Sequence, residues 1–292
     1  MDLRSWVDLF LQGRRAAGCT VATLRCYAHA LEAFCRSGLA PTPEGVQVYL
    51  DQLRARMKPT SVHHHYRALR VFFRWCVRTG RLDQDPLADL KVRAPRTLPR
   101  VPTPEEVAAL LRACPDTPEG RRNRAMVCLL ADSGLRKEEL RRLRIRDVDL
   151  LTRTVRVWSG KGQKDRVTYF GDATASVLRS WLSVHPCPRP EAPLFCTGSG
   201  DMLGPFGIGQ VLARLSRRAG IRRTGPHALR HYAATSLMRS TGDLELVRRV
   251  LGHTTLAMAL RYASITDEVI RAKFQAHSPL DQLWTGAPAP RR

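Results

Sequence analysis

A histidine and an arginine share the start of one predicted helix. Pro226 stands where the first helical residue is expected, which places His227 in the first turn and Arg230 one turn later on the same side. The free N–H groups and dipole of a helix N-terminus favour an anion, so the pair predicts an anion-binding site. His227 and His231 also have the spacing of a helical metal-binding pair. No glutamate follows His227 and no cysteine pair completes a ligand set, so no metal is predicted.

Two further basic side chains follow predicted turns. Arg136 comes after a glycine turn at the start of a predicted helix, and Glu139, three residues later, lies on the same face and can hold its guanidinium. Lys161 stands between two glycines at the tip of a predicted hairpin, from which an ammonium group could reach a distant site. A turn lysine that simply faces solvent is the alternative for Lys161, and a surface ion pair is the alternative for Arg136.

The last candidates lie near the end of the chain. Gly252 stops one predicted helix, Thr254 caps the next, and His253 stands between them; that next helix ends near Tyr262. A tyrosine in such a place more often packs than reacts. Together, however, these groups are what phosphoryl transfer requires. Arginines and histidines neutralise a pentavalent phosphate, a lysine protonates a departing oxygen, and a tyrosine attacks and stores the bond covalently. No carboxylate cluster suited to Mg²⁺ is apparent, so the protein itself must supply the positive charge.

Residues 1–90 are predicted to form helices only. Apolar residues recur at three- and four-residue spacing, and the fourth predicted helix, from about Thr60 to Thr79, has a second face that is almost purely basic. Such a face suits contact with a phosphate backbone, although a merely solvated surface is the alternative. Its members are Arg67, Arg70, Arg74 and Arg78.

The proline-rich segment 91–104 predicts a semi-rigid linker and a domain boundary. Beyond it, residues 105–292 mix helices with one hairpin, whose alternating strands are Thr154–Trp158 and Arg166–Phe170. Further helices are predicted at the following ranges: 104–114, 120–133, 136–143, 172–183, 205–219, 226–240, 243–250, 254–262 and 266–275. The expected fold class is therefore mainly α with a small antiparallel sheet (α+β), and the last residues are expected to form a loose tail.

Composition narrows the function classes. The chain of 292 residues carries a net charge of +22, and both sides of the linker are basic, which predicts a polyanionic partner. Scattered arginines of a GC-rich genome are the alternative. The longest apolar run, 125–131, is too short to cross a membrane, and the beginning of the sequence does not have the pattern of a signal peptide. The 8 cysteines form no Cys-x-x-Cys pair and are expected to be free thiols of a cytoplasmic protein.

The order and spacing of five motifs resemble the tyrosine recombinase (phage integrase) family, in particular its Xer-like members. The motifs are Ser-Gly-Leu-Arg136-x-x-Glu-Leu, Gly-Lys161-Gly-x-Lys-x-Arg, His227-x-x-Arg230-His, Leu-Gly-His253 and Tyr262. The resemblance covers nearly the whole chain. It implies a helical core-binding domain and a catalytic domain that together form a C-shaped clamp on double-stranded DNA. The implied catalytic set is Arg136, Lys161, His227, Arg230, His253 and Tyr262, with Glu139 in support.

The resemblance further implies that Tyr262 attacks a DNA phosphate, which leaves a 3′-phosphotyrosyl link and a free 5′-hydroxyl, without any cofactor. A tetramer on paired DNA sites, or an assembly with a related recombinase, is the expected active form, located in the cytoplasm at the nucleoid. Two other functions remain open at this point. A type IB topoisomerase uses related chemistry but rejoins the same strand, and a catalytically inactive DNA-binding module would share only the fold.

Overall fold

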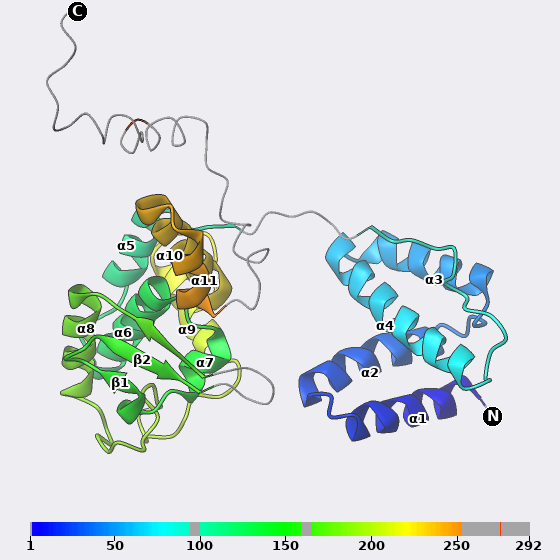
Figure 1. The fold of residues 1–292 in the computed structure, drawn as a ribbon, viewed down its shortest axis with the longest axis horizontal. Helices are drawn as coiled ribbons and strands as arrows, with labels where there is room; N and C mark the ends of the chain where they lie inside the picture. Colours follow the sequence, from blue (N-terminus) through cyan, green and yellow to red (C-terminus); the bar gives the residue numbers. More distant parts are fainter. Residues whose placement is uncertain (1, 94–99, 159–164, 253–274, 276–292) are drawn as a thin grey trace, which may run out of the picture. The chain divides into compact units, whose positions relative to one another are not determined.

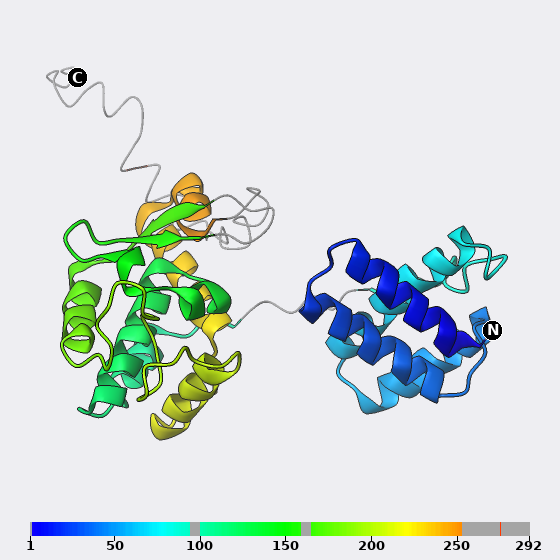
Figure 2. The same cartoon turned by 90° about the horizontal axis from the view of Figure 1, so that it is seen from below.

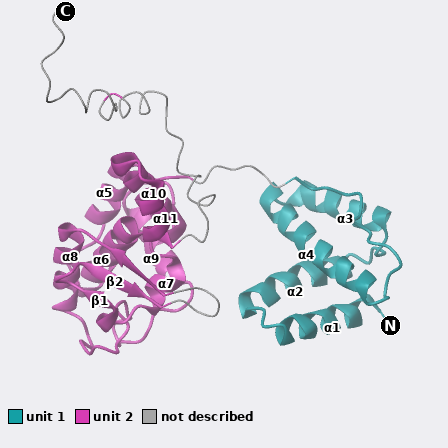
Figure 3. Cartoon of the chain, in the orientation of Figure 1, with its two compact units in different colours: residues 1–98 teal, residues 99–292 magenta. Residues whose placement is uncertain are grey.

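The computed structural model describes residues 2–93, 100–158, 165–252 and 275 (Figure 1). The chain divides into two compact units, Met1–Leu98 and Pro99–Arg292, so the division falls within the proline-rich segment (Figure 3). Each unit has its own hydrophobic core. None of the described helices is both long enough and apolar enough to cross a membrane. All eight cysteines are free.

The first unit consists of helices α1 (Leu3–Ala16), α2 (Val21–Arg36), α3 (Pro43–Arg56) and α4 (Pro59–Arg78). Local sequence explains where they begin, since the Thr20 and Thr42 hydroxyls accept N–H groups of the first turns of α2 and α3. Figures 1 and 2 show α1 and α2 side by side, with α4 packed against both.

The core of the first unit is aromatic. Phe10, Phe34, Phe72 and Phe73 are buried, and their rings meet edge to face, both with one another and with neighbouring aromatic rings. Helix α4 supplies two of these rings and turns its arginines outward, as the two-faced pattern predicts. The core thereby fixes which face of α4 is available to a partner.

The second unit is built around one central helix, α6 (Pro118–Ser133). Helix α6 packs against α8 (Asp172–Leu182) and α10 (Pro226–Thr241), and residues along its length are fully buried. Four more helices complete the described part of the unit: α5 (Pro104–Arg112), α7 (Lys137–Arg142), α9 (Gly207–Arg218) and α11 (Leu244–Leu251). In Figure 1, α10 and α11 lie beside one another, in agreement with their contacts.

The second unit also contains a three-stranded antiparallel sheet of order β1-β2-β3. The predicted hairpin is present as β2 (Thr154–Val157) and β3 (Arg166–Tyr169), in a register that pairs Thr154 with Tyr169. The fold class, mainly α with a small antiparallel sheet, is confirmed.

The structure corrects several boundaries. Each hairpin strand ends one residue earlier than predicted, since Trp158 and Phe170 lie outside the ladder. The sequence analysis also missed β1 (Val148–Asp149), which at two residues is too short to show alternation, and the short 3₁₀ helix Ile145–Asp147 before it. Two helices are predicted after residue 253. The structure describes only Gln275 in that part of the chain, and this residue is helical.

Candidate active site

Arg136 is held in place by Glu139. Gly134 follows the last residue of α6 as its C-cap, with a φ of 62° in the left-handed region. The chain then turns so that Arg136 is the N-cap of α7. Glu139 accepts two hydrogen bonds from Arg136, one from its backbone N–H at 2.7 Å and one from its Nη1 at 2.7 Å. The helical spacing therefore identified a real contact. The Arg136 side chain keeps 29% of its surface exposed.

Glu139 is also bound by an arginine that the sequence analysis did not single out. Arg166, the first residue of β3, donates from Nη1 and Nη2 to the two Glu139 oxygens, each at 2.8 Å. Burial alone would raise the pKa of the Glu139 carboxyl, but the hydrogen bonds and charges of Arg166 and Arg136 outweigh it and lower this pKa to about 2. At neutral pH Glu139 is thus an anion between two cations.

Arg230 reaches the region around Arg136 from a different helix, α10. It sits one turn into α10 and is only 5% exposed. Its Nη1 donates to the carbonyl of Gly134 and its Nη2 to the carbonyl of Leu251 at 2.8 Å. His227, in the first turn of the same helix, is exposed. Pro226 is the first residue of α10, as predicted.

The end of α11 brings the two catalytic candidates together. Helix α11 finishes at Leu251, and Gly252 follows with a φ of 64°. Arg230 donates to the Leu251 carbonyl, while Arg136 donates from Nη2 to the next carbonyl, that of Gly252, at 3.2 Å. Two guanidinium groups from separate helices therefore meet on consecutive peptide units, and the residue that follows in the chain is His253.

Three predicted site residues, Lys161, His253 and Tyr262, lie outside the described residues. The structure describes the chain on both sides of the Lys161 segment, β2 and β3, and the residue directly before His253. In the described ranges, no group of three or more metal-ligating side chains is placed to hold a metal ion.

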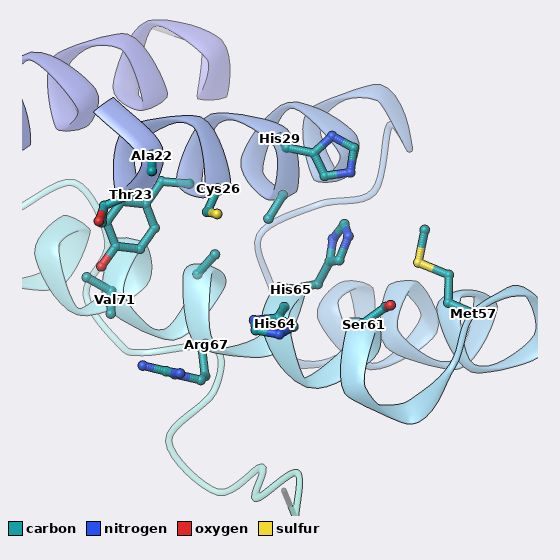
Figure 4. Close-up of a pocket in the computed structure, with 13 residues that line it drawn as sticks. Ala22, Thr23, Cys26, His29, Met57, Ser61, His64, His65, Arg67 and Val71 are labelled. Carbon is teal, nitrogen blue, oxygen red and sulfur yellow. The ribbon is translucent and has the colours of Figure 1, made fainter. Parts of the chain in front are cut away.

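The arginine face of α4 is exposed as predicted. Arg70 donates to the Tyr66 hydroxyl at 3.4 Å, and the Arg74 side chain, 63% exposed, lies 3.9 Å from a carboxylate oxygen of Asp85. Arg67 borders a groove of about 570 Å³ between α2 and α4 (Figure 4). All four arginines of this face, Arg67, Arg70, Arg74 and Arg78, are exposed.

The same groove contains two imidazoles in edge-to-face contact. His29 of α2 and His65 of α4 have ring centroids 5.7 Å apart (Figure 4). The Nδ1 atom of His65 lies 3.0 Å from the Tyr49 hydroxyl. His65 is only 4% exposed, so it belongs to the packing of the unit rather than to its basic surface. Burial and the neighbouring imidazoles also lower the pKa of His65.

Comparisons with known proteins identify the family of the chain. The family model described as "Phage integrase family" matches residues 100–268. Tyrosine recombinase XerC of Xanthomonas campestris pv. campestris (strain B100) is 32% identical over 228 residues, which cover 77% of this chain and 70% of that protein. The XerC of Mycobacterium sp. (strain KMS) is 35% identical over 242 residues, covering 77% of this chain and 79% of the relative.

Solved structures agree in fold. The XerH site-specific recombinase bound to a palindromic difH substrate superposes with a TM-score of 0.71 at 23% identity, covering 92% of this chain and 82% of XerH. The family match extends over more than half of the chain and includes every motif of the second unit. The chain therefore belongs to the phage integrase family and is a site-specific tyrosine recombinase of the Xer-like kind.

Proposed function

We propose that Arg136 and Arg230 bind one scissile phosphate of duplex DNA and that Tyr262 attacks it. The observation that carries this proposal is the meeting of the two guanidinium groups on the consecutive carbonyls of Leu251 and Gly252. Charge-assisted hydrogen bonds from arginine to phosphate oxygens are strong, and they strengthen as negative charge develops in a pentavalent transition state. Two arginines held on consecutive carbonyls can serve the two non-bridging oxygens.

The remaining roles are proposed for residues named from the sequence. The Tyr262 phenol releases its proton to solvent as its oxygen forms a bond to phosphorus. The bond from phosphorus to the 5′-oxygen breaks, and Lys161 donates a proton to that departing 5′-oxygen. His227 and His253 add donors to the phosphate. The products are a 3′-phosphotyrosyl link and a 5′-hydroxyl, and attack by the 5′-hydroxyl of a partner duplex reverses the step. The phosphodiester energy is kept in the link, so the reaction needs no nucleotide cofactor.

The basic surface of the first unit supports double-stranded DNA as the partner. The four α4 arginines project from a face that the aromatic core leaves exposed, which suits binding to a phosphate backbone. XerH, one of the structural neighbours, is bound to its palindromic difH substrate. We propose that both units bind the same duplex, that the active form is a tetramer on paired sites or an assembly with a related recombinase, and that the protein works in the cytoplasm at the nucleoid.

The test is covalent trapping on a nicked duplex. The wild-type chain first selects its site from a pool of random duplexes, and copies of that site are then made with a nick at each successive position. Where the nick lies beside the scissile phosphate, the cleaved fragment diffuses away and the covalent complex persists. We expect the wild type to be trapped and Tyr262→Phe to bind without trapping, because only the nucleophilic oxygen is lost. Trapping of the Phe variant would contradict the assignment.

A second assay separates recombination from topoisomerase-like religation. With two labelled duplexes that carry the selected site, exchange of strands between them is the expected result. Cleavage followed only by resealing of the original strand would favour the topoisomerase alternative.

A further inference from the structure

Arg166 makes a largely buried, bidentate ion pair with Glu139. Its two terminal nitrogens meet the two Glu139 oxygens at 2.8 Å each, and both side chains are 12% exposed. Arginine and carboxylate held in this parallel fashion have a fixed mutual geometry as well as a strong attraction. Most other ion pairs in the described ranges involve at least one exposed side chain. The bidentate contact with Glu139 therefore fixes the position of the Arg166 side chain more closely than most other ion pairs in the described ranges fix theirs.

Glu139 connects Arg166 to Arg136. The same carboxylate oxygen, Oε1, accepts from Nη1 of both arginines, and Oε2 accepts from the Arg136 backbone N–H and from Nη2 of Arg166. The three groups together carry one net positive charge. If Arg166 were neutral, Glu139 would cancel the charge of Arg136, and the pair would attract a phosphate less strongly. With Arg166 present, the carboxylate orients Arg136 without neutralising the cluster.

Arg166 also packs against the second contact that holds Arg136. A Cβ atom on Gly252 would lie 2.5 Å from Cδ and 2.6 Å from Nε of Arg166, so the backbone of Gly252 rests directly on that side chain. The carbonyl of Gly252 is the one that Arg136 Nη2 reaches at 3.2 Å. Glu139 and Gly252 both accept hydrogen bonds from the Arg136 guanidinium, and Arg166 contacts both of these residues.

Stability alone does not explain this arrangement. Removing two charges from water is costly, and a buried ion pair often stabilises a fold no more than apolar residues of similar volume would. The Nε atom of Arg166 is buried and has no hydrogen-bond partner within the part of the chain that is described. An unpaired buried donor carries a further cost. A role in the chemistry gives a reason for keeping the charge.

We propose that Arg166 is a positioning residue for DNA cleavage: through Glu139 and Gly252 it fixes the guanidinium of Arg136, and its charge offsets that of Glu139 so that Arg136 stays cationic toward the phosphate. The proposal rests on the proposed function, because it assumes that Arg136 binds the scissile phosphate. It assigns Arg166 no contact with DNA.

The experiment measures single-turnover cleavage of the selected nicked duplex at saturating protein, together with the dissociation constant of the intact duplex. The variants are Arg166→Met, Arg166→Lys, Glu139→Gln and the double variant Arg166→Met/Glu139→Gln. Arg153→Met is the matched control, because Arg153 forms an ion pair with Asp172 in which both side chains are exposed, 46% and 82%. Thermal unfolding verifies that each variant is folded.

We expect Arg166→Met to slow cleavage by roughly 10-fold or more, less than the ~10²-fold or more expected for loss of a transition-state donor itself, because Arg166 only positions that donor. The dissociation constant should stay close to that of the wild type. Arg166→Lys keeps the charge but loses the fork, so its rate should lie between the two. The double variant should be no slower than Arg166→Met, because removing the carboxylate restores the positive charge of Arg136 and the two changes act on one cluster. Arg153→Met should match the wild type.

Two results would overturn the proposal. One is cleavage by Arg166→Met within roughly 2-fold of the wild type, which would leave the activation free energy almost unchanged. The other is a double variant slowed by the product of the two single effects, as independent residues would be. If Arg166→Met does not fold, Arg166→Lys and its combination with Glu139→Gln give the same comparison. Failure of the wild type to form any covalent complex would instead contradict the proposed function, so the two failures are distinguishable.

Discussion

Replacing Glu139 with glutamine removes a charge while leaving a side chain of nearly the same shape. In the wild type this carboxylate accepts four hydrogen bonds from two arginines and is 12% exposed. Glutamine can accept fewer of these bonds and cannot offset the two cations. We therefore expect Glu139→Gln to lower the free energy of unfolding of the second unit at neutral pH.

The size of the effect follows from the pKa. The arginines lower the pKa of Glu139 from its ordinary 4.5 to about 2, and each unit is worth about 1.4 kcal/mol, so the ionised carboxylate contributes about 3 kcal/mol. The sign is that of an acid with a depressed folded-state pKa. The stabilisation is fully present above pH 4.5, declines as the pH falls below that value, and is largely lost at pH 2.

Equilibrium urea unfolding at several pH values between 6 and 2.5 tests this expectation, with separate transitions fitted for the two units. The difference between wild type and Glu139→Gln should shrink as the pH falls. Glu245→Gln is the matched control. Two arginines also lower the pKa of Glu245 to about 2, but that carboxylate is exposed to solvent, so its loss should have a much smaller effect. A difference for Glu139→Gln that stays constant from pH 6 to 2.5, or one no larger than that of the control, would refute the reasoning.

Three further predictions concern DNA. Arg136→Lys and Arg230→Lys should each reduce cleavage by ~10²-fold or more with little change in binding, because lysine keeps the charge but lacks the planar fork; rates within a few-fold of wild type for both would contradict their role. Arg70→Ala/Arg74→Ala should lower the slope of log K against log salt by roughly 0.9 for each lost phosphate contact, and an unchanged slope would mean that α4 does not face DNA. Lys161→Ala should cut an ordinary phosphodiester slowly yet cut a 5′-bridging phosphorothiolate at close to the wild-type rate, because a thiolate leaves without a proton. If sulfur does not rescue the variant, Lys161 is not the general acid.

Sequence periodicity was enough for most of the fold because the signals are local. Threonine caps, proline at the first helical position and apolar stripes act within one or two turns, and α2, α3 and α10 begin where those residues stand. The strand β1 was missed for the same reason. It is formed by pairing with β2 and has no pattern of its own.

The site shows the same limit. The spacing of Arg136 and Glu139 predicted their contact, since residues three apart share one helix face. Nothing local connects Glu139 with Arg166, which lies 27 residues away, or Arg230 with Gly134, 96 residues away. These contacts depend on how α7, β3, α10 and α11 pack. The only signal for Arg166 was its place in the Gly-Lys-Gly-x-Lys-x-Arg motif.

The most direct test of the account identifies the bond that links protein to DNA. The wild-type chain is trapped on the nicked duplex, digested with protease, and the peptide that carries nucleotide is sequenced by mass spectrometry. The account predicts that the peptide contains Tyr262, joined through its phenolic oxygen to a 3′-phosphate, and that the released strand has a 5′-hydroxyl that a kinase can label. A link to any other residue, or to a 5′-phosphate, would contradict it.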